Sequence, residues 1–258
     1  MRLILTLVLA GLLSVECHAT NVLLIGTAHN HPPGTHMYLE VCQVLQKCLE
    51  QTPGVVAVVS EDWPKDDSRL KNLDAIVLYT GPGGDVLLDP SHRAVADKLM
   101  KDGVGLTAIH WATDSKVELA VDYQALLGGW FSGPFGTHDI TTKTLEQINP
   151  SHPICRGWSP FELYDEYYVY ARVSPNARPL LKVELKTGPQ TVAWTLERPK
   201  SKGGRSFGAT VEHFYDTMKQ EPFRRMLVNG VLWTAKVPIP ATGAPVAISD
   251  QEIDALVK

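Results

Sequence analysis

The sequence predicts an α/β protein in which a doubly wound, mostly parallel sheet carries helices on both faces. Two observations predict this fold class. Short apolar runs alternate with amphipathic stretches over residues 21–125, the pattern from which parallel sheets are built. The composition is 44% hydrophobic and 20% charged, so a chain of 258 residues can bury a sizeable core.

The first strand is predicted at residues 21–26, an apolar run that ends in glycine. Apolar side chains then recur at helical spacing over residues 36–51, and Pro53-Gly54 ends that helix. Similar reasoning gives the remaining elements of the alternating part: strands at 55–59, 74–79 and 104–109, and a helix at 91–101 that Gly103 stops.

Beyond residue 125 the pattern changes to loops and extended segments. A glycine-rich loop is expected at 128–136, followed by strands at 137–144, 166–173, 180–185, 191–196 and 207–211 and a helix at 222–235. Prolines at 238 and 240 break this helix, and Ser249-Asp-Gln-Glu252 is a capping box that opens a short final helix. We therefore expect one domain over residues 20–240 and a tail with a short helix over residues 241–258.

The first residues have the features of a signal peptide. Arg2 is followed by an almost wholly apolar run to Leu13 and then by Cys17-His-Ala19, a plausible cleavage site. The run is too short for a good transmembrane helix. We therefore expect residues 1–19 to be removed, no membrane span to remain, and the protein to be periplasmic or secreted.

Charge and cysteine content exclude several classes of protein. The formal net charge is -4 and the basic residues are scattered, so neither nucleic acid nor an anionic membrane is an expected partner. Cys42, Cys48 and Cys155 remain after the leader, without a CxxC knuckle or a disulfide framework. The oligomeric state is not encoded in any of these features.

Histidines follow three of the predicted strands. His29, His31 and His36 come after the first strand, His110 after the fourth and His213 after the last. Ligands of open parallel sheets bind beyond the carboxyl ends of the strands. Taken singly, each histidine could be a solvated loop residue or one bonded to a backbone carbonyl. Together they predict one cleft.

Val104 to Asp114 is the most informative stretch of the chain. A buried strand stops abruptly at His110 and small, helix-compatible residues follow, which indicates a sharp strand-to-helix elbow. α/β-Hydrolases present a nucleophile on such an elbow. A histidine there can instead act as a general base near neutral pH, and Glu166 and His213 are candidates for further acid–base groups.

The other candidate residues are assigned to ligand binding. His29, His31 and His36 could ligate a divalent metal, completed by Asp165, Glu166 or His213, although their spacing matches no known zinc motif. The same histidines could instead hydrogen-bond sugar hydroxyls. Trp111, with nearby Asp114, suits a sugar, although such aromatic residues are more often core. No GxGxxG or P-loop motif is present, so no nucleotide cofactor is expected.

Several motifs along the chain resemble those of one family. They are the histidine-rich loop 29–36, Gly105-Leu-Thr-Ala-Ile-His110 with Asp114, Gly128-Gly-Trp-Phe131, His152-Pro-Ile154, Asp165-Glu-Tyr-Tyr168, Val192-Ala-Trp194, Gly204-Arg205 with His213, and Asn229-Gly-Val-Leu-Trp233. In this order they resemble the ThuA-like (trehalose utilisation) family, a branch of the class I glutamine amidotransferase-like fold, over residues 21–236.

The resemblance implies a flavodoxin-like sandwich with the elbow over the cleft. Amidotransferases carry a nucleophilic cysteine there, paired with a later histidine. His110 replaces that cysteine, so a thiolate route to ammonia is unavailable and glutamine should not be hydrolysed. The family name implies sugar metabolism, with roles around 3-keto sugars. Glu212-His213, in place of a more usual Gly-His, and the long 81–89 loop depart from the family pattern and leave the substrate open.

These observations predict an exported carbohydrate-active enzyme that transfers a proton on a keto-sugar or related glycoside, as an isomerisation or elimination. The catalytic candidates are His110, Glu166 and His213; the substrate-binding candidates are His29, His31, His36, Trp111, Asp114 and Asp165. The alternatives are a non-catalytic sugar-binding module and a metal-dependent hydrolase.

Overall fold

A nine-stranded sheet organises the molecule, which is described by a computed structural model over residues 19–257. The predicted signal peptide therefore falls almost wholly outside the described residues. The strand order is β2-β1-β3-β4-β11-β10-β9-β6-β7. Every pairing from β2 to β11 is parallel, and every pairing from β11 to β7 is antiparallel. The α/β fold class predicted from the sequence is confirmed.

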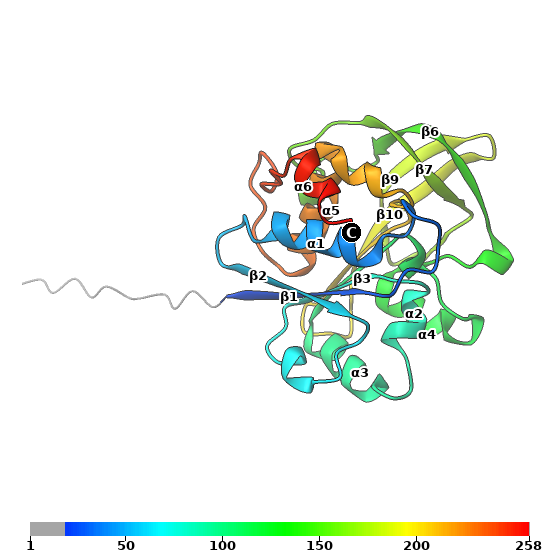
Figure 1. The fold of residues 1–258 in the computed structure, drawn as a ribbon. Coiled ribbons are helices and arrows are strands. Elements are labelled where there is room, and N and C mark those ends of the chain that lie inside the picture. The colour runs from blue at the N-terminus through cyan, green and yellow to red at the C-terminus, as the bar shows by residue number, and fades with distance from the viewer. Residues whose placement is uncertain (1–18, 258) are drawn as a thin grey trace, which may run out of the picture.

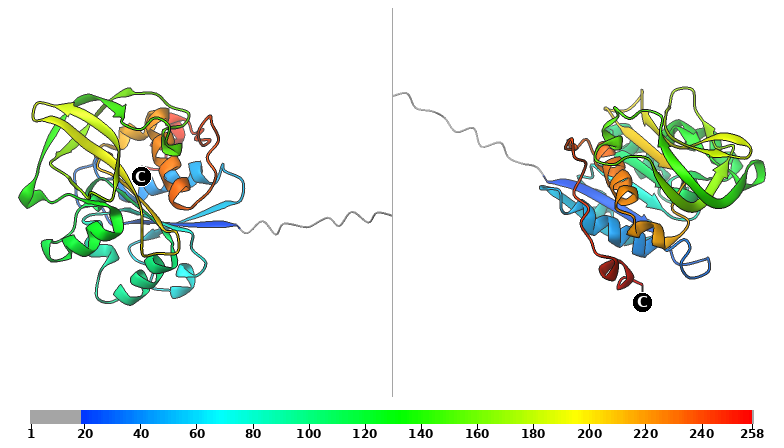
Figure 2. Two further views of the ribbon diagram at one scale, coloured as in Figure 1. Left: turned by 180° about the vertical axis from the view of Figure 1, so that it is seen from behind. Right: turned by 90° about the horizontal axis from the view of Figure 1, so that it is seen from above.

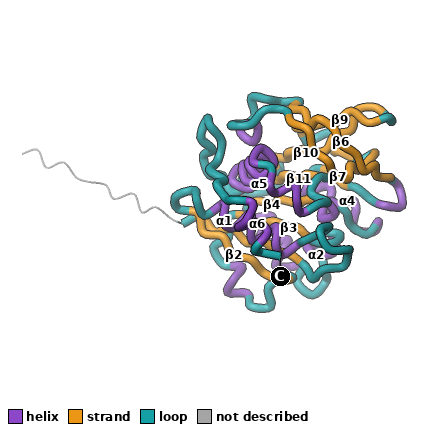
Figure 3. Tube along the Cα trace, turned by 45° about the horizontal axis from the view of Figure 1, so that its top comes forward, coloured by secondary structure: helices purple, strands orange, loops and turns teal. Residues whose placement is uncertain are grey.

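The parallel part comprises β1 (Thr20–Gly26), β2 (Val55–Glu61), β3 (Ala75–Tyr79), β4 (Gly105–Ile109) and β11 (Arg205–Ala209). The antiparallel part comprises β6 (Thr137–Gln147), β7 (Phe161–Val169), β9 (Arg178–Leu185) and β10 (Gly188–Glu197). It lies to one side of the parallel strands (Figures 1 and 3). A separate small ribbon pairs β5 (Gly129–Trp130) with β8 (Arg172–Val173).

Helices cover both faces of the parallel strands (Figures 1 and 2). One face carries α1 (Tyr38–Leu49) and α5 (Glu221–Thr234); the other carries α2 (Gly83–Leu87), α3 (Arg93–Asp102) and α4 (Ala120–Leu127). Successive residues of β1 point into opposite cores. Val22 and Leu24 pack in the core on the face of α1 and α5, and Leu23 and Ile25 pack in the core on the face of α2, α3 and α4. Because both faces of β1 are buried, apolar residues stand at all four of these positions.

Three of the differences from the sequence predictions lie at or next to strand ends. The 81–89 segment, expected as a loop, contains α2. The final parallel strand ends at Ala209 rather than at Val211. β7 begins at Phe161, so Asp165 and Glu166 lie inside the strand instead of at its entry. Pairing with β6 extends β7 in this way, because a cross-strand partner can hold polar residues extended.

The C-terminal tail packs against the domain rather than standing apart from it. Ser249 and Glu252 form the predicted capping box of α6 (Asp250–Asp254). Ala244, Val246 and Ile253 are buried in the same core as α1 and α5. Within residues 19–257, no helix is long and apolar enough to cross a membrane.

Candidate functional site

The elbow after β4 has the sharp geometry that the sequence predicted. His110 has a φ of 54° and opens the short 3-10 helix His110–Thr113. Thr113 Oγ1 donates to the His110 carbonyl at 2.7 Å, which closes the turn. A non-glycine residue in this left-handed region is uncommon, and such positions cluster at functional sites.

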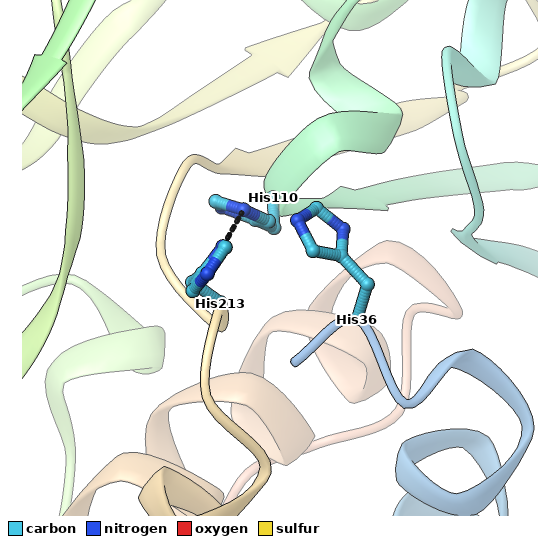
Figure 4. Close-up of side chains that lie close together, drawn as sticks. All are labelled: His36, His110 and His213. Atoms are coloured by element: carbon cyan, nitrogen blue, oxygen red, sulfur yellow. Dashed lines mark hydrogen bonds between the residues drawn. The ribbon is translucent and has the colours of Figure 1, made fainter. Parts of the chain in front are cut away.

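Two further histidines are brought to the elbow by paired loops. The His36 amide donates to the His213 carbonyl at 3.0 Å, and Thr35 forms an isolated bridge with Phe214. These contacts join the loop after β1 to the loop after β11. The side chains of His36, His110 and His213 consequently converge, with one ring nitrogen from each lying within 4.8 Å of the others (Figure 4).

The hydrogen bonds of His110 define its tautomer. Its Nδ1 lies 2.9 Å from the Thr210 carbonyl oxygen, which can only accept, so Nδ1 carries a proton. Its Nε2 therefore presents a lone pair when the ring is neutral. That nitrogen lies 3.3 Å from His213 Nδ1 and 3.3 Å from the Tyr168 hydroxyl.

The expectation that His110 itself borders the cleft is wrong. Its side chain is 0% exposed, because the rings of His36, Tyr168 and His213 pack around it at centroid distances of 4.8, 4.8 and 5.3 Å. Burial, reinforced by the neighbouring His36, holds its pKa well below the usual value. His110 is thus a neutral ring beneath the cleft.

A cavity of about 270 Å³ lies above these rings. Its walls combine imidazole, aromatic and carboxylate side chains. The lining residues are His31, His36, Trp111, Asp114, Phe131, Gly133, Gly136, Thr137, His138, Glu166, Tyr168 and His213. It is therefore a mixed apolar and polar site of the kind that binds small molecules.

Glu166 is the carboxylate that faces the buried histidines. Its oxygens lie 3.8 Å from His110 Nε2, 3.7 Å from His213 Nδ1 and 3.9 Å from His138 Nε2. Burial raises the pKa of Glu166, opposed by the nearby His138. The group is therefore a carboxylate whose proton affinity is increased and which opens onto the cavity.

Asp165, a substrate-binding candidate in the sequence, lies in the interior and does not line the cavity. It is 0% exposed, because neighbouring strand residues face opposite ways and Glu166 takes the cavity side. Its Oδ1 accepts from the amides of Glu166 at 2.8 Å and His213 at 2.9 Å, and its Oδ2 from the Glu212 amide at 2.7 Å. Burial raises its pKa to about 7. Asp165 thus positions the backbone of both Glu166 and His213.

Replacing Asp165 by asparagine tests this positioning role. The amide group can supply one acceptor oxygen but turns an N–H donor toward backbone amides that need acceptors. We expect a loss of about 1–3 kcal/mol in the free energy of unfolding, measured by urea titration. Glu162→Gln, an exposed change on the same strand, is the control and should have little effect. Equal stability of the two variants would show that Asp165 is not required to position these loops.

The predicted set of His29, His31 and His36 is not assembled into a ligand group. His29 Nε2 pairs with Glu40 at 3.0 Å, and its side chain is 39% exposed. The His31 ring lines the cavity, stacked on His36 at a centroid distance of 3.9 Å. Its Nδ1 bonds Asn30 Oδ1 at 2.6 Å. Only His36 joins the cluster with His110 and His213.

Trp111 and Asp114 reach the cavity from the turn after the elbow. Asp114 is 8% exposed, its Oδ1 accepts from the Ser115 amide at 2.7 Å, and burial raises its pKa to about 6. Asp114 also bridges to Phe131, which brings the glycine-rich loop to the cavity. Both predicted binding residues therefore lie where a ligand could touch them.

Tyr168 and His138 line the cavity but were not among the site residues predicted from the sequence. Tyr168 stacks on Phe131 at a centroid distance of 3.9 Å and reaches His110 through its hydroxyl. His138 pairs opposite it, on β6. Tyr168 could have been predicted from the sequence, because side chains alternate along a strand and Tyr168 therefore shares a face of β7 with Glu166. His138 could not, because its position depends on the register in which β6 pairs with β7.

The family model that describes ThuA, trehalose utilisation, matches residues 22–234. The chain belongs to the ThuA family. The match runs from β1 to α5 and therefore includes every residue of the site. No curated protein matches the chain.

Two solved structures of ThuA-like proteins agree with the ThuA assignment at the level of the fold. A putative ThuA-like protein from Bacteroides uniformis superposes with a TM-score of 0.67 and 18% identity, covering 85% of this chain and 92% of that one. Another from Parabacteroides merdae gives 0.62 and 16%, covering 88% and 97%. A glutamine amidotransferase from Thermotoga maritima gives 0.49 and 9%, covering 85% and 99%.

Proposed function

We propose that this ThuA-family chain is an exported carbohydrate-active enzyme that transfers a proton on a keto-sugar or related glycoside, by isomerisation or elimination. The observation that carries the proposal is Glu166, a partly buried carboxylate with a raised pKa that faces a cavity with imidazole walls. The cavity volume is near the lower end of ligand pockets, about 300–1,000 Å³, which favours a small molecule over a polymer.

Glu166 would act as the general base. A base is most effective when its pKa approaches the working pH, and burial moves Glu166 in that direction. It would remove the proton from the carbon beside the carbonyl group. In an isomerisation the proton returns to the former carbonyl carbon while the hydroxyl proton moves to the carbonyl oxygen; in an elimination the adjacent C–O bond breaks and the leaving oxygen takes the proton that Glu166 has removed.

The surrounding side chains would bind and orient the sugar. Trp111 and Phe131 present apolar rings on which a sugar face can stack, and Asp114 and His31 can bond hydroxyl groups. His110 is buried, so its role in this proposal is to hold His213 and Tyr168 in place rather than to touch the substrate. The absence of a cysteine at the elbow argues against amidotransferase chemistry.

Export is proposed on the basis of the leader. The fold is consistent with cleavage after Ala19, because β1 begins at Thr20. N-terminal sequencing of protein recovered outside the cytoplasm should begin at Thr20. Recovery of the mature fold only in the cytoplasm, with Met1 retained, would exclude export.

Solvent isotope exchange tests the proposed chemistry. Purified protein is incubated with a 3-keto-disaccharide in D₂O, and the sugar is followed by NMR. We expect deuterium at the carbon beside the carbonyl, together with an isomerised or eliminated product, and no ammonia release from glutamine.

The alternatives give different results in the same experiment. A hydrolase would cleave the glycoside without carbon-bound deuterium. A sugar-binding module would show saturable shifts of the ligand signals without exchange or product. Either result across a panel of keto-sugars would contradict the proton-transfer proposal.

A further inference from the structure

We propose that His36, His110 and His213 form a binding site for one divalent transition-metal ion such as Zn²⁺, with Glu166 beside the ion as the base. This ligand set replaces the predicted set of His29, His31 and His36, and it draws on three loops that are far apart in the sequence. The inference deepens the proposed function, since a bound ion would act as a Lewis acid on the sugar carbonyl.

The spacing of the ring nitrogens suits a shared ion. His110 Nε2 and His213 Nδ1 lie 3.3 Å apart. Two nitrogens bound to zinc at about 2.0–2.1 Å in a tetrahedral arrangement lie roughly 3.4 Å apart. All three ligand atoms lie within 4.8 Å of one another, so binding requires a small inward shift of the most distant nitrogen.

Hydrogen bonds behind two of the rings orient their free nitrogens toward the cluster. His110 donates from Nδ1 to the Thr210 carbonyl, which leaves Nε2 as the ligand atom. The Tyr38 hydroxyl donates to Asn30 Oδ1 and can therefore accept from His36 Nδ1, 3.1 Å away. Metal-binding histidines commonly donate their second ring N–H to such a partner, which fixes both tautomer and orientation.

The backbone adopts uncommon, positive-φ conformations at or next to the three histidines. His36 and His110 have φ values of 48° and 54°, and Glu212, which precedes His213, has a φ of 101°. Non-glycine residues in this region typically cost on the order of 1–3 kcal/mol and persist where the surrounding structure requires them. Each of the three loops that supply a proposed ligand thus has a non-glycine residue with positive φ at its histidine or next to it.

The three rings are largely buried: His110 is 0% exposed, His36 4% and His213 9%. Glu166 lies 3.7–3.8 Å from the two closest nitrogens, beyond hydrogen-bond length, and leaves the cavity side open.

The competing explanation is a metal-free hydrogen bond. In that case His213 Nδ1 donates to His110 Nε2 across the same 3.3 Å, and the cluster has no affinity for an ion. The two explanations differ in whether purified protein binds metal at this place, which can be measured without any substrate.

Metal titration of chelator-treated protein tests the proposal. Zn²⁺ is followed by calorimetry and Co²⁺ by its visible absorption. We expect saturation at one ion per chain and a Co²⁺ spectrum typical of four-coordinate nitrogen-rich sites. His36→Ala and His213→Ala should each weaken binding at least about tenfold, within the range for disturbed metal sites.

Two other histidines provide matched controls. His29→Ala and His138→Ala remove imidazoles outside the set, one from the loop that carries His36 and one from the cavity wall, and should leave affinity unchanged. Circular dichroism and thermal melting check that every variant folds. The proposal is overturned if wild-type protein shows no saturable binding, or if the ligand and control variants bind alike.

The metal inference and the proposed function can fail separately. Glu166→Gln should retain the ion, because Glu166 is the base and not a ligand. Deuterium exchange that persists undiminished in excess chelator would overturn the metal site and leave proton transfer standing. Stoichiometric ion binding without exchange on any keto-sugar would support the metal site and remove the proposed chemistry.

Discussion

Glu166→Gln is expected to lower kcat/KM for a keto-sugar by about 10²–10⁴, the usual contribution of a general base. Glutamine keeps the size of the side chain and its hydrogen-bonding oxygen but cannot take a proton. The structure predicts that the fold tolerates the change, since among residues 19–257 the charged or ionisable groups within 4 Å of the Glu166 carboxylate are imidazoles at 3.7–3.9 Å. Steady-state kinetics and deuterium exchange measure the loss.

Glu162→Gln is the matched control for this variant. Glu162 lies on the same face of β7, four residues earlier, and is exposed. It should retain wild-type kcat/KM, and both variants should melt within a few degrees of wild type. If Glu166→Gln turned over the sugar at the wild-type rate, another group would have to be the base.

Trp194→Ala should cause the largest loss of stability, about 3–5 kcal/mol. Trp194 is 0% exposed, and its indole Nε1 donates to the Leu127 carbonyl at 3.1 Å. The backbones of Gly129 and Gly208 approach the indole so closely that a Cβ on either would lie 2.3 and 2.5 Å from it. Because Gly129 and Gly208 lie against the ring, these two residues offer no side chain to fill the cavity left by alanine.

Urea unfolding monitored by far-ultraviolet circular dichroism measures this effect. Trp63→Ala is the control, because Trp63 is only partly buried and stacks on His92 near the surface. It should cost clearly less. Equal losses for the two variants would show that Trp194 is not the packing centre between β10, β11 and α4.

The sequence by itself determined the parallel half of the fold and the elbow. The apolar runs of β1, β3 and β4 are continuous because both of their faces are buried, and that signal is local. The abrupt end of β4 at His110 was likewise legible in the chain, as was the capping box at Ser249. Such features depend on neighbouring residues alone.

Which side chains form the site was decided by tertiary structure. Asp165 and Glu166 are adjacent in the sequence, but the register of β7 against β6 turns one into the interior and the other toward the cavity. His29 and His36 share a loop, yet the pairing of Thr35 with Phe214 brings only His36 to the cluster.

The burial of His110 also depends on tertiary contacts. Its place at the end of β4 is fixed locally, but three rings from other loops and strands cover it. Strand register and loop pairing are made by contacts between residues that are distant in the chain. No local pattern specifies them, so the sequence located the end of the sheet where the site lies, and packing selected the residues that face the ligand.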